Sequence, residues 1–251
     1  MAAQDELVHR EVADGVSTIT LDSPHNRNAL SSRLVTELFD ALDASETDDA
    51  ARVVLLRSAD RVFCSGADLT EAATGMEEGT RALVALQRRL LTHPLPIVTR
   101  LAGPVRAGGL GIVAASDIVV CGDDVSFAFT ESRLALAPAV ISLSVLPRIT
   151  SRAAADTFLT GRTFDAAQAE AMGLVTRTVP AAHLDEEVAQ VCADLKRAHP
   201  QGLRETKALL AGPVVAQLDA RAEEMAALSA RLFSSSQARE AMTAFLSRKQ
   251  P

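Results

Sequence analysis

Two adjacent glycines, Gly108 and Gly109, precede a run of small and apolar residues that continues to Ser116. This composition predicts a helix that is packed on all sides. Because glycine has no Cβ, a ligand atom can reach the free backbone N–H groups at such a helix start. These groups lie at the positive end of the helix dipole and favour an oxygen that carries negative charge. The alternative is that the glycines only permit close packing of the helix on a strand.

Glu131 is the candidate proton carrier beside this helix start. Most of its neighbours in the sequence are apolar, namely Phe127, Phe129, Leu134, Leu136 and Val140. A carboxyl group buried among such residues has a raised pKa, which suits proton transfer near neutral pH. We therefore predict that the glycine helix holds an oxyanion while Glu131 moves a proton. The alternative is an ordinary exposed acid at the end of a loop.

Four other reactive residues have simpler interpretations. No histidine lies near Cys64 in the sequence to activate it, so a packed thiol is predicted rather than a nucleophile. Asp68 is expected to hold its own loop through side-chain hydrogen bonds. Asp117 is expected to end the glycine helix or to cap the next strand. Arg106 could meet a phosphate or a pantetheine amide, or it could be a solvated surface residue.

The elements that must position these residues alternate between strands and helices. Strands are predicted at 7–11, 16–21, 53–56, 97–101, 117–121 and 126–128, and helices from near Ser31 and over 81–92. The first two strands flank Asp14-Gly15, a tight-turn dipeptide typical of a hairpin. The later alternation favours crossover connections and a largely parallel sheet.

The pattern changes after Glu131. Helices are predicted at 140–149, 151–159, 166–172, 184–198, 203–210 and from 214 to about 248, with one further strand at 175–179. We place a boundary near 151–161, between a mixed core over residues 1–150 and a helical region over residues 151–251. The polar segment 73–79 is expected to be mobile and to shape a ligand pocket.

Composition excludes several classes of function. The chain has 251 residues, a net charge of −7, no Trp, no Tyr and only 3% aromatic residues, which argues against nucleic-acid binding. Its three cysteines form no CxxC pair, and its histidines are scattered, so we expect free thiols in a reducing compartment and no metal site. The longest uncharged apolar stretch, 134–147, is too short to span a bilayer, which needs about 20 residues. The charged N-terminus does not resemble a signal peptide, so a cytoplasmic protein without membrane partners is expected.

Four segments together resemble the signatures of the enoyl-CoA hydratase/isomerase (crotonase) superfamily. The segment 63–69, with the sequence FCSGADL, resembles its first signature loop, and 103–117 resembles its second. Residues 160–166 with 173–175 resemble the third, and 238–245 resemble the closing helix. Each segment alone is weakly specific. Their order and coverage of nearly the whole chain are specific for the superfamily, and less so for the reaction.

This resemblance implies a fold, a ligand and a site. The fold is an α/β crotonase-like spiral of ββα units with a C-terminal helical region that forms homotrimers or dimers of trimers. The ligand is an acyl-CoA thioester that serves as substrate, with no separate cofactor and no metal. The thioester oxygen is held by two backbone N–H groups, which fall on Ala67 and Gly108 here. The second assignment agrees with the physical argument above.

The two catalytic glutamates of the superfamily have different counterparts in this chain. One falls on Glu131, and the other falls on Gly111, where no acid is present and open space is expected. Hydratases with both acids use the pair to position and deprotonate water, whereas one carboxylate suffices to move a proton between carbons. Some superfamily sequences named hydratases also carry glycine there.

The resulting prediction is an enoyl-CoA hydratase in fatty-acid or related acyl-CoA breakdown. One alternative is a Δ3,Δ2-enoyl-CoA isomerase that uses Glu131 alone, and another is an acyl-CoA-binding protein without catalysis. Decarboxylation and thioester hydrolysis rank lower, because the segment 138–140 places apolar groups where some relatives have polar ones.

The resemblance also implies residues that contact CoA. The loop 27–30 would meet the nucleotide through Arg27 and Ala29. The acyl–pantetheine channel would be lined by Ala67, Asp68, Leu69 and Thr70. Arg248 or Lys249 could reach a phosphate, or could be solvated charges of the chain end.

Overall fold

Two β-sheets form the framework of the protein. The computed structural model describes residues 6–59, 61–71 and 76–247. In the larger sheet the strand order is β1-β2-β3-β4-β6-β9. These strands are β1 (Val8–Ala13), β2 (Val16–Leu21), β3 (Val53–Ser58), β4 (Ile97–Leu101), β6 (Ile118–Gly122) and β9 (Arg177–Val179). Strands β1 and β2 pair as the expected antiparallel hairpin, and the remaining pairs are parallel.

The smaller sheet has the order β5-β7-β8 and consists of β5 (Val105–Arg106), β7 (Ser126–Ala128) and β8 (Phe164–Asp165). Two isolated parallel bridges, Leu30 to Ala67 and Cys64 to Val105, continue this row toward the N-terminal half. Successive turns of the chain therefore add one strand to the large sheet, one short segment to the small row, and then a helix. This repetition is the predicted spiral of ββα units.

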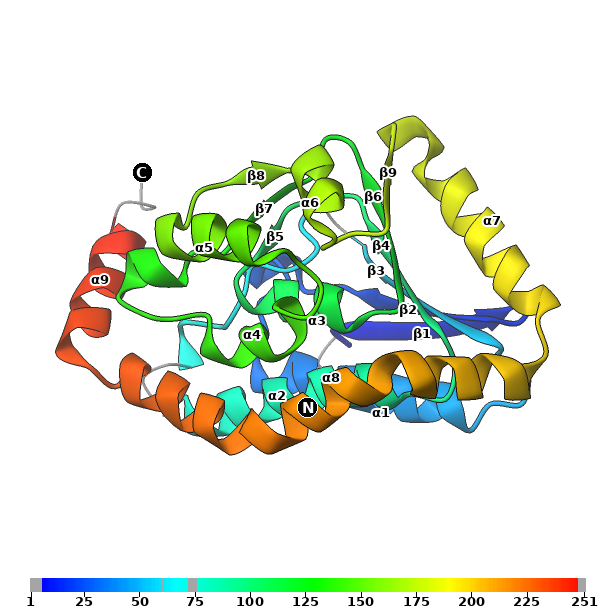
Figure 1. The fold of residues 1–251 in the computed structure, drawn as a ribbon, viewed down its shortest axis with the longest axis horizontal. Coiled ribbons are helices and arrows are strands. Elements are labelled where there is room, and N and C mark those ends of the chain that lie inside the picture. The colour runs from blue at the N-terminus through cyan, green and yellow to red at the C-terminus, as the bar shows by residue number, and fades with distance from the viewer. Residues whose placement is uncertain (1–5, 60, 72–75, 248–251) are drawn as a thin grey trace.

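Helices cover both faces of the large sheet and surround the small one. They are α1 (Ser32–Glu46), α2 (Glu77–Thr92), α3 (Gly108–Ala115), α4 (Ala139–Val145), α5 (Ser151–Thr160), α6 (Ala166–Met172), α7 (Leu184–Arg197), α8 (Pro200–Phe233) and α9 (Ser236–Ser247). Short 3-10 helices occur at η1 (Pro24–Asn26), η3 (Glu131–Leu134) and η4 (Ala181–His183). In Figure 1, α3 lies in the middle of the molecule and α8 runs along one edge.

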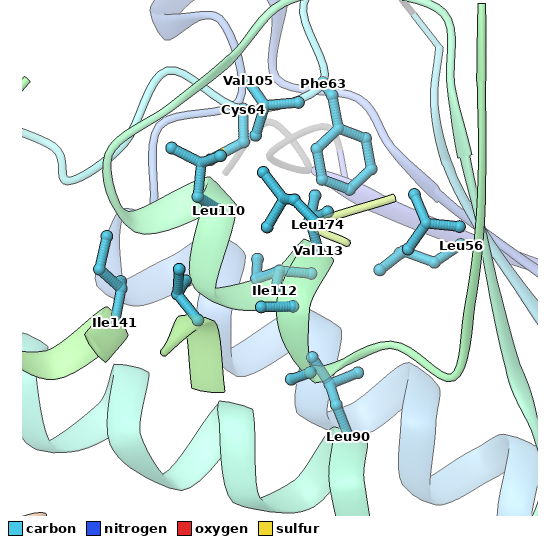
Figure 2. Packing of buried hydrophobic residues seen from close by; sticks show 14 of the residues in the cluster. Leu56, Phe63, Cys64, Leu90, Val105, Leu110, Ile112, Val113, Ile141 and Leu174 are labelled. Carbon is cyan, nitrogen blue, oxygen red and sulfur yellow. The ribbon is translucent and has the colours of Figure 1, made fainter. Parts of the chain in front are cut away.

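Helix α3 is buried along its whole length, as its small and apolar composition predicted. Figure 2 shows Leu110, Ile112 and Val113 of this helix among apolar side chains from other turns of the spiral. On the other side of the large sheet, α7 packs through Val188, Val191 and neighbouring residues against inward-facing valines of β3, β4 and β6. Because these parallel strands are covered on both faces, β3 and β6 begin with four consecutive apolar residues rather than with an alternating pattern.

The C-terminal helices differ from the prediction. A break was expected near Gly212-Pro213, but α8 continues through Pro213 and ends at Phe233. A proline removes one backbone hydrogen bond from a helix interior. Apolar residues of α8 on both sides of Pro213, such as Ala211 and Leu218, belong to the main core, and this packing outweighs the lost bond. The predicted helix at 140–149 ends earlier, at Val145, and β5 and β8 were too short to be detected.

A buried ion pair fastens α8 to the core. Lys207 is only 6% exposed, and its Nζ lies 2.7 Å from Asp117 Oδ2 while it donates to the carbonyl oxygens of Leu90 and Leu95. Burial lowers the pKa of Lys207, and Asp117 opposes that effect. Asp117 also accepts from the backbone N–H of Ile97, so it caps the start of β4 rather than of β6, which follows it. The pair thus joins α8, the end of α2 and the start of β4.

Replacing Lys207 should destabilise the fold strongly. Lys207→Met leaves the Asp117 carboxylate without its cation, and removing one partner of a buried pair costs about 3 kcal/mol of unfolding free energy. Urea unfolding measures this loss. The matched control is Arg88→Met, which removes an exposed ion pair with Asp219 and should leave the unfolding midpoint almost unchanged. Equal losses in the two variants would contradict the role given to Lys207.

Candidate active site

The backbone amides of Ala67 and Gly108 lie next to each other. An ideal Cβ built on Gly108 would lie 3.8 Å from the Ala67 nitrogen, and one built on Gly66 would lie 3.6 Å from the Gly108 nitrogen. Gly108 is the first residue of α3, where helix N–H groups have no partner within the helix. Within the described residues, neither of these two N–H groups donates a hydrogen bond. The two amides predicted to form an oxyanion hole are therefore close together and available.

Both amides follow a sharply turned residue. Gly66 has φ +99°, and Ala107 has φ 45° with ψ −119°, a conformation that costs an L-residue about 1–3 kcal/mol. The two residues touch, since a Cβ on Gly66 would lie 2.9 Å from the Ala107 methyl carbon. This contact holds the loop before Ala67 against the start of α3. It also explains why position 66 needs glycine.

Glu131 follows the strand beside the one that leads into α3. Strand β7 pairs in parallel with β5, and the Ala107 N–H donates to the Ala128 carbonyl oxygen at 3.1 Å. Gly108 is the next residue after Ala107, and Glu131 comes three residues after Ala128 as the first residue of η3. The topology therefore brings the segment that carries Glu131 to the same end of the small sheet as the two amides.

The Glu131 carboxyl is buried and incompletely paired. Its Oε2 atom is inaccessible and has no hydrogen-bond partner in the described part of the chain. Burial raises the pKa of Glu131 to about 7. Phe129 next to it is 1% exposed, and Leu136 is 9% exposed, which gives the apolar setting that the sequence suggested. A carboxyl with this pKa can both accept and donate a proton near neutral pH.

Asp68 holds the loop that carries Ala67. Its carboxylate accepts from Asn26 Nδ2 at 3.0 Å, from the Thr70 N–H at 3.0 Å and from the Thr70 hydroxyl at 2.7 Å. Burial acts to raise the pKa of Asp68, but the hydrogen bonds from Thr70 and Asn26 outweigh it and leave the pKa below its usual value. Asp68 thus has the structural role expected for it and remains an anion.

The loop proposed to meet the nucleotide has an unusual backbone. Arg27 and Asn28 have φ values of 57° and 53°, in the left-handed region. The Asn28 side chain, 1% exposed, accepts from the Ser23 N–H and donates to the Val62 carbonyl oxygen. Sequence analysis did not identify Asn28 as this anchor, although asparagine is one of the few residues that adopt a left-handed backbone readily. The anchor leaves the Arg27 side chain exposed.

The expected open space beside Gly111 is absent. Gly111 is fully buried, and an ideal Cβ on it would lie 2.9 Å from Ile141 Cγ2 and 3.2 Å from Gln87 Cδ. The prediction was wrong because the side chains of α2 and α4 that fill this volume are distant in the sequence. No acid stands at this position.

Two further candidates are structural. Arg106 donates to the Ser126 carbonyl oxygen at 2.6 Å and to the Ser126 hydroxyl at 2.9 Å, so it joins β5 to β7. Cys64 is fully buried, and burial raises the pKa of its thiol to about 12, as expected for a packed thiol. Arg248, Lys249 and residues 72–75 lie outside the described residues, and 77–79 form the first turn of α2.

Comparison with known proteins identifies the family. The sequence profile described as enoyl-CoA hydratase/isomerase matches residues 11–251. The chain belongs to this family. A crystal structure of an enoyl-CoA hydratase from Mycobacterium avium is 44% identical, has a TM-score of 0.92, and covers 99% of each chain.

Two curated relatives show the range of chemistry in the enoyl-CoA hydratase/isomerase family. A Thermus thermophilus protein provisionally named an enoyl-CoA hydratase is 36% identical over 78% of this chain and 80% of its own length. An Arthrobacter 4-chlorobenzoyl coenzyme A dehalogenase is 33% identical over 79% of this chain and 76% of its own length.

Among the described residues of this protein, no helix is long and apolar enough to cross a membrane.

The contact between Gly66 and Ala107 gives a direct test of the amide pair. Gly66→Ala forces an L-residue to adopt φ +99° and places a methyl group 2.9 Å from the Ala107 methyl carbon, so the Ala67 amide should move. We expect catalytic efficiency to fall about 100-fold, the effect of losing one oxyanion donor. The control is Gly79→Ala, where nothing lies within 4 Å and the helix should gain stability. Steady-state kinetics with unchanged efficiency in Gly66→Ala would contradict this geometry.

The burial of Glu131 predicts a pH-dependent stability. A carboxyl whose pKa rises from 4.5 to about 7 on folding destabilises the folded state by on the order of 3 kcal/mol once pH exceeds 7. Below pH 4.5 the carboxyl is protonated in both states, and this effect disappears. Glu131→Gln should therefore be more stable than wild type at pH 8 and equally stable near pH 4, as measured by chemical denaturation. The exposed substitution Glu240→Gln should show no such difference.

Proposed function

We propose that this protein performs acid–base catalysis on enoyl-CoA thioesters, with Glu131 as the proton carrier. The observation that carries the proposal is the buried carboxyl with a pKa of about 7, placed at the same end of the small sheet as two free amides. Membership of the enoyl-CoA hydratase/isomerase family supports an acyl-CoA substrate. The N–H groups of Ala67 and Gly108 would hold the thioester oxygen.

The geometry supports a shift of the double bond best. Hydrogen bonds to the thioester oxygen stabilise the enolate that forms when a proton leaves C2, and one such donor contributes about 3 kcal/mol to lowering the barrier. With a 3-enoyl thioester, Glu131 takes the C2 proton, and the electron pair delocalises over the carbonyl oxygen and C4. Glu131 then returns the proton to C4, which leaves the double bond between C2 and C3. This reaction needs one carboxyl and no water.

Hydration of a 2-enoyl thioester is the second candidate, and the names of the relatives favour it. Glu131 would take a proton from water as the water oxygen adds to C3, and would then deliver that proton to C2. A third possibility is a protein that binds the thioester without turning it over.

Further assignments belong to the same proposal. CoA would contact residues of two loops, namely Arg27, Ala29, Ala67, Asp68, Leu69 and Thr70. No cofactor or metal is required by this chemistry, and the proposed location is the cytoplasm. We also propose a homotrimer or a dimer of trimers, because Leu159, Leu209 and Leu210 are 78%, 79% and 76% exposed in the single chain.

Absorbance of the conjugated thioester separates these reactions. The purified protein is incubated with a 3-enoyl-CoA and, separately, with a 2-enoyl-CoA. We expect absorbance to rise with the 3-enoyl-CoA, because the double bond moves into conjugation. A loss of absorbance with the 2-enoyl-CoA would show hydration instead. Tight binding with no change for either substrate would support a binding protein.

The pH profile tests the role of Glu131. Because Glu131 must be ionised to accept the first proton, catalytic efficiency should rise with pH and reach half its maximum near pH 7. Glu131→Gln should lower the turnover number about 1000-fold, within the range usual for a lost general base. Unchanged turnover in this variant would remove Glu131 from the mechanism.

A further inference from the structure

One face of α2 lies along the first turn of α3. An ideal Cβ on Gly108 would lie 3.3 Å from Leu83 Cδ2, and one on Gly111 would lie 3.2 Å from Gln87 Cδ. Leu83 and Gln87 are four residues apart and so share a face of α2, while Gly108 and Gly111 are three residues apart and share a face of α3. A side chain at position 111 would therefore lie on the same face of α3 as Gly108, whose N–H is the predicted oxyanion donor. It would enter the space next to the Gln87 side chain.

Gln87 is a fully buried amide whose hydrogen bonds are made inside the protein. Its Nε2 donates to the Leu83 carbonyl oxygen at 3.1 Å and to the Val140 carbonyl oxygen at 3.3 Å. Its Oε1 accepts from the Ser144 hydroxyl at 2.6 Å. An amide neither gives nor accepts a proton near neutral pH, and both Nε2 hydrogens are engaged. Gln87 thus occupies this volume without supplying acid–base chemistry.

The volume at Gly111 is closed to any larger group. A Cβ there would lie 2.9 Å from Ile141 Cγ2 and 3.3 Å from Gln87 Oε1. The Ser144 hydroxyl, which bonds to Gln87, also lies 3.2 Å from the Gly111 carbonyl oxygen. Helices α2, α3 and α4 therefore meet at this point through one polar network inside an apolar core.

We propose that Gln87 is a reaction-specificity residue. Together with Ile141, its neutral and fully engaged amide fills the space at Gly111, and so prevents a second proton-transferring group or a water molecule from occupying the position beside the oxyanion donors. Glu131 is then the sole proton carrier, and the double-bond shift is favoured over water addition. This inference rests on the proposed function of Glu131.

The test compares reaction rates in Gln87→Ala, Gly111→Glu and the double variant. The measured quantity is the ratio of hydration of a 2-enoyl-CoA to isomerisation of a 3-enoyl-CoA. We expect this ratio to be below one in the wild type and at least tenfold higher in the double variant, which has both the space and the second acid. Leu90→Ala is the control, because Leu90 is also a buried residue of α2 but none of the nearest contacts at Gly111 involves it, and its ratio should be unchanged.

A stability measurement keeps the test decisive if Gly111→Glu fails to fold. Gly111→Ala adds only a Cβ, and in the wild type it should lower the melting temperature by about 5 °C. In the Gln87→Ala background the loss should be smaller, because the two contacts with Gln87 are removed while the contact with Ile141 Cγ2 remains. In the Leu90→Ala background it should stay the same.

The outcomes separate this inference from the proposed function. A wild type that hydrates faster than it isomerises contradicts the inference about Gln87 and leaves the role of Glu131 intact. An unchanged ratio in a folded double variant also overturns it, as does an equal cost of Gly111→Ala in all three backgrounds. The proposed function itself would be contradicted by a wild-type protein without turnover or by a Glu131→Gln variant that remains active.

Discussion

The contact between Gly66 and Ala107 determines how the two halves of the site meet. Each residue adopts a positive φ angle, and each is followed directly by an amide with a free N–H group. Ala67 lies outside the named strands, and Ala107 is the single residue between β5 and α3, so the separation of the two amides depends on this contact and on pairing in the small sheet. The strain in Ala107 persists because its N–H is bonded to Ala128 and its methyl group is packed on Gly66.

The chemistry of the site also depends on exclusion of water. Helix α3 carries no charged side chain and is buried throughout, so the groups around Gly108 are mostly apolar or neutral. In such surroundings a carboxyl loses hydration, and the pKa of Glu131 rises because the hydrogen bond from its own backbone N–H only partly offsets this loss and Oε2 has no partner among the described residues. The same low polarity strengthens hydrogen bonds from the two amides to a developing negative charge. The proposed oxyanion stabilisation and the proposed proton transfer would thus share one physical cause.

Much of the fold could be predicted from the sequence. The Asp14-Gly15 hairpin, the apolar start of strand β3 and the fully apolar α3 have local patterns that few other structures fit. Strands β5 and β8 could not be found, since two residues show no periodicity and their pairing partners are distant. The course of α8 through Pro213 was likewise decided by tertiary packing rather than by local preference.

The candidate site was only partly predictable for a similar reason. Glycines before a helix and an acid among apolar residues are local signals, and they indicated Gly108 and Glu131. The filling of the space at Gly111 arises from Gln87 and Ile141, which are 24 residues before and 30 residues after it in the sequence. The local sequence around Gly111 does not indicate that Gln87 and Ile141 pack against it, so the filling of this space could be seen only in the structure.

The spiral arrangement has a consequence for how such proteins diversify. Ala67, Gly108 and Glu131 each come from a different turn of the chain, and their relative positions are set by pairing in the small sheet row. Connections between turns lie outside that row, so their length and composition can change while the reacting groups stay in register. Changes in these surface connections would let one scaffold serve different reactions, in line with the similarity of this chain to proteins named as an enoyl-CoA hydratase and as a dehalogenase.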